Sequence, residues 1–119
     1  MRDVQAEADV DRALWHLQFS IWRQDGKVVV GYGAPAKATV WLNWVGVTAR
    51  DMTYVVDSTK TKQGRYIPGT DIEIRDRVGG NPDVILILAN NYRDEIAEKL
   101  EPHPPGTELW CIFPPYRIS

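Results

Sequence analysis

With 119 residues, the chain is long enough for one domain that buries a hydrophobic core without disulfides or a structural metal. Apolar residues make up 44% of the sequence and five residues are tryptophans, which excludes a disordered chain. The formal net charge of −2 argues against a broad basic surface, so we expect no nucleic-acid partner.

Cysteine and histidine are scarce. Cys111 is the single cysteine and cannot form an internal disulfide, and with only His16 and His103 there is no zinc set. Because Cys111 lies in the apolar run 109–113, we expect an inert core residue rather than a nucleophile. The sequence shows no signal peptide and no apolar segment long enough to span a membrane, which predicts a cytoplasmic protein with no membrane partner.

Residues 1–119 are expected to form a single domain, with a leading helix over residues 1–26 and an α/β core over residues 27–119. Two apolar stripes indicate the helix over residues 6–24. The first stripe consists of Val10, Leu14, Leu17 and Ile21. The second lies beside it and consists of Trp15, Phe19 and Trp22. Together they are wider than one docking face, so either the helix is deeply buried within the domain or part of it covers another domain or subunit.

A glycine-rich turn follows the first predicted strand. Three valines at 28–30 indicate a strand buried on both faces, as in a parallel sheet. Glycines then permit a tight turn that leaves backbone N–H groups uncovered, and a proline suits the first turn of the helix that follows. This order of strand, turn and helix N-terminus predicts an anion site, for example for pyrophosphate. Its candidate ligand-binding residues are Gly31, Tyr32, Gly33, Ala34 and Pro35.

Two charged residues bear on this prediction. Lys37, in the first turn of the helix, is either a solvated lysine or a cation beside a bound phosphate. Asp57 ends the predicted strand 53–57 and lies 21 residues after Ala36, so the pattern fits a loose dinucleotide fingerprint. In that pattern the acid accepts hydrogen bonds from ribose hydroxyls. The alternative is that Asp57 only caps a loop.

The polar loop over residues 58–69 is a second candidate region. It carries three cations and two glycines at the carboxyl end of a predicted parallel strand, the edge at which open α/β sheets bind ligands. The alternative is a solvated, flexible surface loop. The candidate binding residues of this loop are Lys62, Gln63, Arg65, Pro68 and Gly69.

The other elements complete the expected fold. The helix over residues 36–45 is expected to turn Val40, Trp41 and Trp44 largely toward the sheet and to end at Gly46. A short strand over residues 72–74 and a buried strand over residues 83–88 follow.

A last helix and strand close the chain. The helix over residues 92–100 is expected to be capped by Asn90 and Asn91, with Ile96 and Leu100 on its inner face. Residues 108–113 read as a final strand, and the tail from residue 114 is too rich in proline to pair centrally.

Strands alternate with helices along the chain, and parallel neighbours need such crossovers. The sequence therefore predicts an α/β fold: a small Rossmann-like three-layer sandwich with a leading N-terminal helix and a mostly parallel sheet of about five strands.

Several stretches are similar to one known family. Residues 31–37 read Gly-Tyr-Gly-Ala-Pro-Ala-Lys, where the family typically reads G-Y-G-A-x-x-K. The run Lys-Gln-Gly-Arg-Tyr-Ile-Pro-Gly-Thr at 62–70, after the Val-Val-Asp strand, is the most specific part. Residues 42–47, 82–88 and 94–96 also agree. The chain resembles the C-terminal domain of sugar C-methyltransferases, which act on nucleotide-linked deoxysugars with S-adenosylmethionine.

The resemblance implies a Rossmann-like domain that, in full-length members, follows a zinc-binding domain and a central adenosylmethionine domain. The substrate then lies in a cleft between domains, and the chemistry belongs to the central one. This chain has no cysteine cluster, no second glycine-rich motif, and no Glu-His pair similar to the family's base region. No catalytic residue, metal or cofactor is therefore assigned to it, and S-adenosylmethionine is expected on a partner domain.

The leading hypothesis is a stand-alone or excised C-terminal domain that helps position a nucleotide-linked sugar beside a separate methyl-donor domain, without catalysing alone. That methyltransferase domain or subunit would bind through the first helix, while Lys37, Lys62 and Arg65 face the phosphates or the partner. One alternative is an independent module that binds NAD or coenzyme A through the glycine turn and Asp57. Another is an interaction domain without a small ligand.

Overall fold

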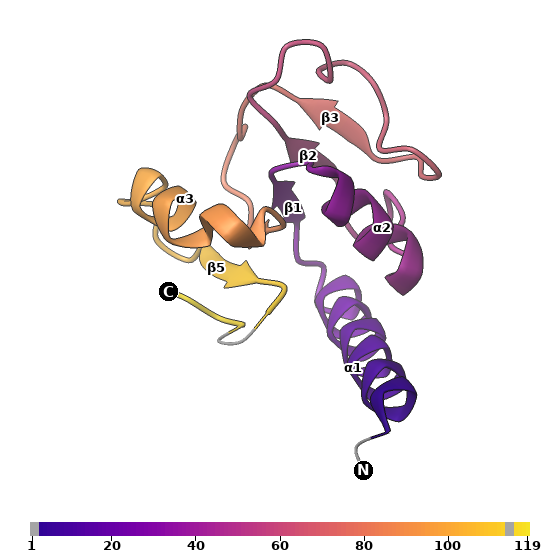
Figure 1. Ribbon diagram of the computed structural model, residues 1–119. Helices are drawn as coiled ribbons and strands as arrows, with labels where there is room; N and C mark the ends of the chain where they lie inside the picture. The colour runs from indigo at the N-terminus through magenta and orange to yellow at the C-terminus, as the bar shows by residue number, and fades with distance from the viewer. Residues whose placement is uncertain (1–2, 114–115) are drawn as a thin grey trace.

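A computed structural model of the chain describes residues 3–113 and 116–119 (Figure 1). The helices are α1 (Val4–Gln24), α2 (Ala36–Val45) and α3 (Arg93–Lys99), and a short 3-10 turn, η1 (Asn90–Tyr92), leads into α3. The strands are β1 (Val29–Tyr32), β2 (Tyr54–Val56), β3 (Glu73–Arg75), β4 (Val84–Ile87) and β5 (Glu108–Cys111).

The five strands form one sheet in the order β3-β2-β1-β4-β5, and every pair of neighbours is parallel. The central strand β1 pairs with β2 on one side and with β4 on the other. After β1 the chain builds outward to β2 and β3, then returns across the sheet to β4 and β5. This arrangement confirms the predicted α/β sandwich with a parallel sheet and a leading helix.

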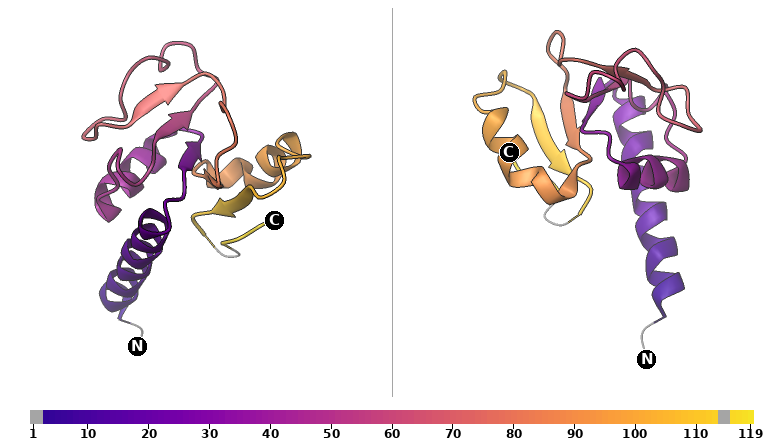
Figure 2. Two further views of the ribbon diagram at one scale, coloured as in Figure 1. Left: turned by 180° about the vertical axis from the view of Figure 1, so that it is seen from behind. Right: turned by 45° about the horizontal axis from the view of Figure 1, so that its top comes forward.

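Both faces of the sheet are covered, because α1 and α2 lie on one face and α3 lies on the other (Figure 2). Successive side chains of β1 pack on opposite faces of the sheet. Val29 packs with the residues under α1 and α2, whereas Val30 packs on the side of α3. The inner strands β2 and β4 are continuously apolar because they are buried on both faces. The small α3 covers its face with half-buried Ala97 and Leu100.

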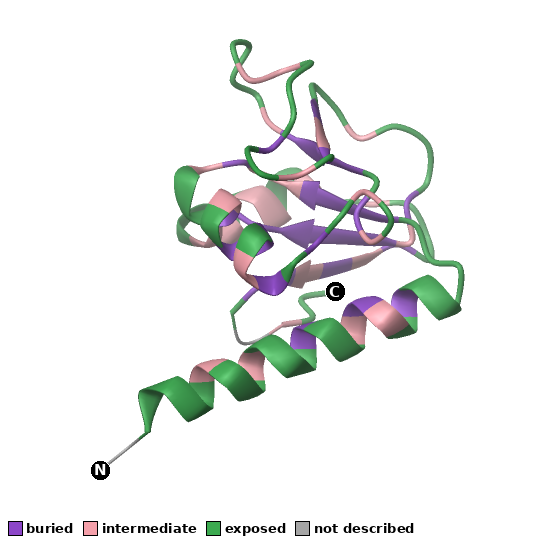
Figure 3. Cartoon of the chain, turned by 90° about the vertical axis from the view of Figure 1, so that its right-hand side faces the viewer, coloured by how far each residue is buried: buried purple, intermediate pink, exposed green. Residues whose placement is uncertain are grey.

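The helix α1 buries only one of its two apolar stripes and is therefore not deeply buried. The aromatic stripe packs on the domain, with Trp15, Phe19 and Trp22 at most 5% exposed. The aliphatic stripe faces outward, and its residues are 42–59% exposed: Val10, Leu14, Leu17 and Ile21. Figure 3 shows α1 lying along the sheet with its buried residues in the half near β1. Deep burial of the helix is therefore wrong, while cover by another domain stays a prediction.

The helix α2 is apolar around most of its circumference, so its periodicity does not single out one buried face. Its buried residues are Ala38, Trp41, Leu42 and Val45. The prediction for Val40 is wrong, because this side chain is 68% exposed, and Trp44 is half-buried. Gly46 ends the helix as predicted, with φ +84° and its N–H donated to the Leu42 carbonyl.

The glycine turn begins later than expected. Gly31 lies inside β1, in register with Val55 and Leu86. A Cβ at this position would come within 2.8 Å of the Met52 sulfur and 2.9 Å of the Leu88 Cδ1. A side chain at position 31 would displace these buried side chains, so close packing favours glycine there. The turn itself belongs to Gly33, with φ +91°.

The cap of α3 differs from the prediction. Tyr92, not Asn90 or Asn91, occupies the N-cap position of α3, and no side chain caps the helix. Residues 116–119 lie antiparallel along the edge of β5, where Leu109 exchanges backbone hydrogen bonds with residues 118 and 119. The prolines at 114 and 115, on which the prediction for the tail depends, lie outside the described residues. Cys111 is fully buried, as expected of a core residue.

Candidate functional site

The loops after β1 and β4 diverge at the centre of the sheet. The first leads to α2 on one face, and the second leads to η1 and α3 on the other. Gly33 and Ala89 meet here, because a Cβ on Gly33 would lie 2.7 Å from the Cβ of Ala89. Open α/β sheets bind ligands in the crevice outside the carboxyl ends of the strands, where neighbouring connections go to opposite faces. The ridge formed by Gly33 and Ala89 divides this crevice into two cavities.

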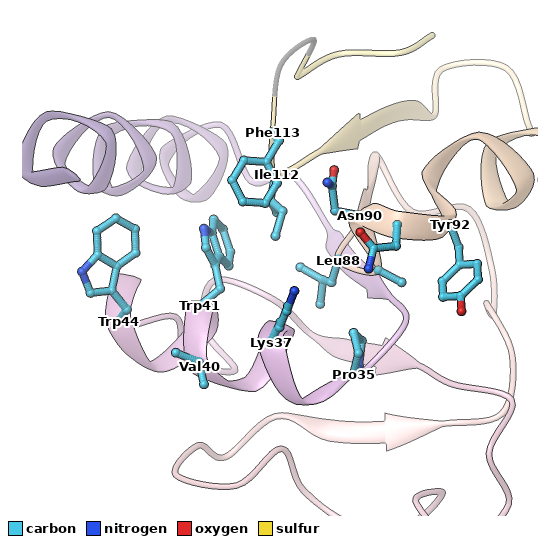
Figure 4. A pocket seen from close by; sticks show the side chains of 12 residues that line it. Pro35, Lys37, Val40, Trp41, Trp44, Leu88, Asn90, Tyr92, Ile112 and Phe113 are labelled. Atoms are coloured by element: carbon cyan, nitrogen blue, oxygen red, sulfur yellow. The ribbon is translucent and has the colours of Figure 1, made fainter. Parts of the chain in front are cut away.

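An apolar cavity of about 480 Å³ opens on the side of α2 (Figure 4). It lies between α2 and the segments that follow β4 and β5. Its apolar walls are Val40, Trp41, Trp44, Leu88, Ile112 and Phe113. Its polar residues are Lys37, Asn90, Asn91 and Tyr92. A mostly apolar cavity with a few convergent polar groups is typical of sites for small molecules.

Lys37 is the cation of this apolar cavity. Figure 4 shows its side chain rising from the first turn of α2 toward the loop after β4. The ammonium forms no hydrogen bond or ion pair with any residue that the structure describes, so its donors are available to a ligand. Asn90 lines the same cavity, and its Oδ1 is a buried acceptor without a partner among the described residues.

A polar cavity of about 410 Å³ lies on the other side of the ridge, toward α3. It is lined by Tyr32, Asp57, Thr59, Lys62, Glu95 and Lys99, among others. The Lys99 ammonium lies 5.9 Å from the centre of the Tyr32 ring, within the range of a cation–π contact. Two lysines and two carboxylates balance one another here, so this cavity has no strong preference for an anion.

Asp57 supports the glycine turn. One carboxylate oxygen accepts the Ala34 N–H at 2.8 Å, and the other accepts the Thr59 N–H at 2.7 Å. Burial raises the pKa of Asp57, but the hydrogen bonds from Thr59 and Ala34 and the charge of Lys62 outweigh it, so the pKa lies below 3.8. This is the loop-capping geometry that the sequence left open, and binding of ribose hydroxyls by Asp57 stays a prediction.

Lys62 and Gln63 join the loop after β2 to the same turn. The Lys62 ammonium donates to the Ala34 carbonyl at 2.9 Å and lies 4.0 Å from Asp57 Oδ2. The Gln63 amide donates to the Asp57 carbonyl at 2.9 Å. These contacts hold the first part of the loop against β1, which differs from the solvated, flexible loop considered as the alternative.

The structure does not bring all candidate residues together. Gly33, Ala34, Pro35, Asp57 and Lys62 line the polar cavity with Tyr32. Pro35 also lines the apolar cavity with Lys37. Arg65, Pro68 and Gly69 lie elsewhere, and Gly31 is enclosed in the sheet.

The last part of the loop after β2 packs on the distal half of α2. The Asn43 amide donates to the Pro68 carbonyl at 2.9 Å, and Gly69 lies against the same side chain. Asn43 is six residues beyond Lys37, about 9 Å along the helix axis. Arg65 is exposed, and its backbone pairs with Ile74. We therefore do not group these three residues with Lys37.

Sequence reasoning missed much of the apolar cavity. Trp41 is a core residue as predicted but also lines the cavity, and Trp44, predicted as core, and Asn90, predicted as a helix cap, line it as well. One signal could have indicated it: two asparagines and a tyrosine begin three residues after the end of the buried strand β4, at the edge where such sheets bind ligands. Phe113 carried no comparable signal.

Within residues 3–113 and 116–119, which the structure describes, no helix has the length and apolar character needed to cross a membrane. No three His, Cys, Asp or Glu side chains in that part of the chain are grouped so that they could hold a metal ion.

Residues 5–114 match the family described as the C-methyltransferase C-terminal domain. The C-methyltransferase NovU of Streptomyces niveus is 40% identical over 77 residues, which correspond to 62% of this chain and 18% of that protein. The chain thus spans less than one fifth of this curated relative. The family match covers most of the chain and confirms the resemblance found in the glycine turn and the loop after β2. The chain therefore belongs to the family of C-methyltransferase C-terminal domains.

Proposed function

We propose that this domain binds a nucleotide-linked sugar and positions it beside a separate methyl-donor domain. The observation that carries the proposal is the apolar cavity at the centre of the sheet, where Lys37 and Asn90 face aromatic walls. Membership in the C-methyltransferase family supports a role in methyl transfer, and the relative NovU is itself a C-methyltransferase.

The chemistry of the cavity matches the three parts of such a ligand. Trp41, Trp44 and Phe113 offer flat apolar surfaces on which a nucleobase or a deoxysugar ring can pack. Lys37 supplies a point charge for a phosphate. Asn90 and Asn91 supply amides for sugar hydroxyls. The volume of about 480 Å³ is within the usual range for small-molecule sites.

The methyl donor is assigned to another domain. A dinucleotide or an adenosyl group at the glycine turn would need an acid at the end of β2 for its ribose hydroxyls. Asp57 occupies that position, and each of its carboxylate oxygens accepts one backbone N–H, which commits part of its acceptor capacity to the loop. Membership in a family of C-terminal domains, with 18% of the relative NovU aligned, supports placing the methyl donor on another part of such a protein. In this proposal the domain contributes proximity and orientation, and no proton transfer.

A calorimetric binding panel tests the proposal on the purified chain. The panel consists of a thymidine-diphosphate deoxysugar, S-adenosylmethionine, NADH and coenzyme A. We expect heat of binding with the sugar nucleotide alone. Binding of NADH or coenzyme A instead would support the independent module. No binding of any compound would contradict a substrate site within this domain.

A further inference from the structure

The aliphatic stripe of α1 faces away from the core of its own domain. At 100° per residue, its residues Val10, Leu14, Leu17 and Ile21 centre roughly 140° around the helix from the buried aromatic stripe. All four are more than 40% exposed. A contiguous row of exposed apolar side chains on one helix face is unfavourable in water. Such a row usually packs against another protein surface. Within the domain, Trp110 and Tyr116 lie beside this stripe but leave it largely exposed.

The position of α1 relates this stripe to the ligand edge of the sheet. The helix is 21 residues long, about 32 Å, whereas β1 spans four residues, about 13 Å. A short connection at 25–28 places the end of α1 beside the start of β1. The first half of α1 therefore extends past the carboxyl ends of the strands, as Figure 3 shows. A protein partner that docks on this part of α1 would lie beside the carboxyl edge of the sheet, where both cavities open.

A groove next to the stripe fits a protein partner. It has a volume of about 240 Å³ and lies between α1 and the end of the chain, where Leu14, Leu17 and Ile21 face Trp110 and Tyr116. Concave apolar sites of this kind receive the anchor side chains that dominate protein interfaces. The N-cap Asp3 and three acids on the first half of α1, Glu7, Asp9 and Asp11, outnumber the one base there, Arg12. This excess of acids disfavours an anionic lipid surface and predicts a basic rim on the partner.

We propose that the aliphatic stripe and the overhanging half of α1 form the docking surface for the methyl-donor domain. The inference rests on the proposed function, which requires such a domain at the ligand edge. The comparison with NovU supports this occupant, because the aligned region is 18% of that enzyme and the family is a C-terminal domain. In such proteins the remainder of the chain precedes the first helix, so it lies nearest to α1.

A chimera of NovU in which this chain replaces the whole corresponding C-terminal region provides the test. Hydrogen exchange of the amides in residues 4–21 is compared between the chimera and the isolated chain. Docking is expected to slow exchange about tenfold or more in the overhanging half, which is held by few contacts in the isolated domain. The double variant Leu14→Glu/Leu17→Glu is expected to abolish this difference. The control His16→Glu adds a charge at an exposed position on another side of α1 and is expected to preserve it.

Three outcomes would overturn the docking proposal. One is equal exchange in the chimera and the isolated chain, and another is slowed exchange that persists in the double variant. The third is an isolated chain that is dimeric by light scattering and becomes monomeric in the double variant, because a second copy would then cover the stripe. Sugar-nucleotide binding by the isolated chain is expected to be unchanged in the double variant. If the wild-type chain does not bind the sugar nucleotide while docking is still observed, the proposed function is contradicted and the docking proposal is not.

Discussion

The carboxylate of Asp57 accepts a 2.8 Å hydrogen bond from the backbone N–H of Ala34, which joins the end of β2 to the turn after β1. Lys62 approaches the same turn from the other direction and donates to the Ala34 carbonyl at 2.9 Å. Both polar groups of the Ala34 backbone are therefore held by side chains from the loop after β2. This pairing fixes the ridge that divides the two cavities.

The first prediction concerns Asp57→Asn. An amide cannot accept from both the Ala34 and Thr59 N–H groups, so we expect the free energy of unfolding to fall by about 1–3 kcal/mol at pH 7. Because the folded-state pKa of Asp57 is below 3.8, its contribution is complete above that pH and is lost as the pH falls toward the lowered pKa. Urea unfolding from pH 7 to pH 3 should show the difference between wild type and variant shrinking. The exposed Asp76→Asn is the control, with little change expected.

The second prediction concerns Gly33→Ala. The substitution places a side chain at φ +91° and a Cβ 2.7 Å from that of Ala89, so strain and overpacking add. We expect a loss of about 2–4 kcal/mol in stability. Gly26→Ala is a matched control, because Gly26 has φ +68° but nothing within 4 Å of the added Cβ. It should cost only about 1–2 kcal/mol. Equal losses in the two variants would show that Gly33 and Ala89 are not in close contact.

The third prediction compares two neighbours on α1. Trp15→Ala should destabilise the chain by about 3–5 kcal/mol, because the ring is 4% exposed and packs against Trp41 and Tyr116. Leu14→Ala should cost less than about 1 kcal/mol, because Leu14 is 56% exposed. Chemical denaturation measures both. A larger loss for Leu14→Ala would mean that α1 buries the opposite face.

The fourth prediction concerns the aromatic wall of the apolar cavity. Trp44→Ala should weaken binding of the sugar nucleotide by roughly 1–3 kcal/mol, about five- to 150-fold in Kd, because it removes the surface on which a ring of the ligand stacks. Trp110→Ala also removes a half-buried tryptophan, one that packs against Trp22 and lies outside both cavities. The affinity of the Trp110→Ala variant for the sugar nucleotide should equal that of the wild type. Equal affinities in the two variants would exclude stacking on Trp44.

The order and type of the elements could be predicted from the sequence because each strand carries a local signal. Val29, Val30 and the apolar run at 84–87 are buried in the sheet, whereas Val28, which the sequence also predicted as buried, precedes β1 and is 45% exposed. Gly33 and Gly46 both adopt positive φ at the predicted turn and helix end. These features depend on neighbours in the sequence and are therefore readable from it.

The faces of the helices could not be predicted in the same way. On α1, two apolar stripes satisfy the same helical period, and only the shape of the sheet and of Trp41 selects the aromatic one. On α2, Val40 and Trp41 are adjacent, and the position of α1 decides which is buried. The apolar cavity depends likewise on the distance between α2 and the segment at 112–113, which no local pattern specifies.

The most direct test of the proposed function is calorimetric titration of a thymidine-diphosphate deoxysugar into wild type, Lys37→Met and Lys60→Met. Methionine keeps most of the side-chain length and removes the charge, and neither exposed lysine has a described side-chain partner. Lys60 lines neither cavity and serves as the control. We predict that Lys37→Met alone weakens binding by about 1.5–3 kcal/mol, more than tenfold in Kd, with unchanged stability. Binding that is equal in all three proteins would contradict a phosphate site at Lys37.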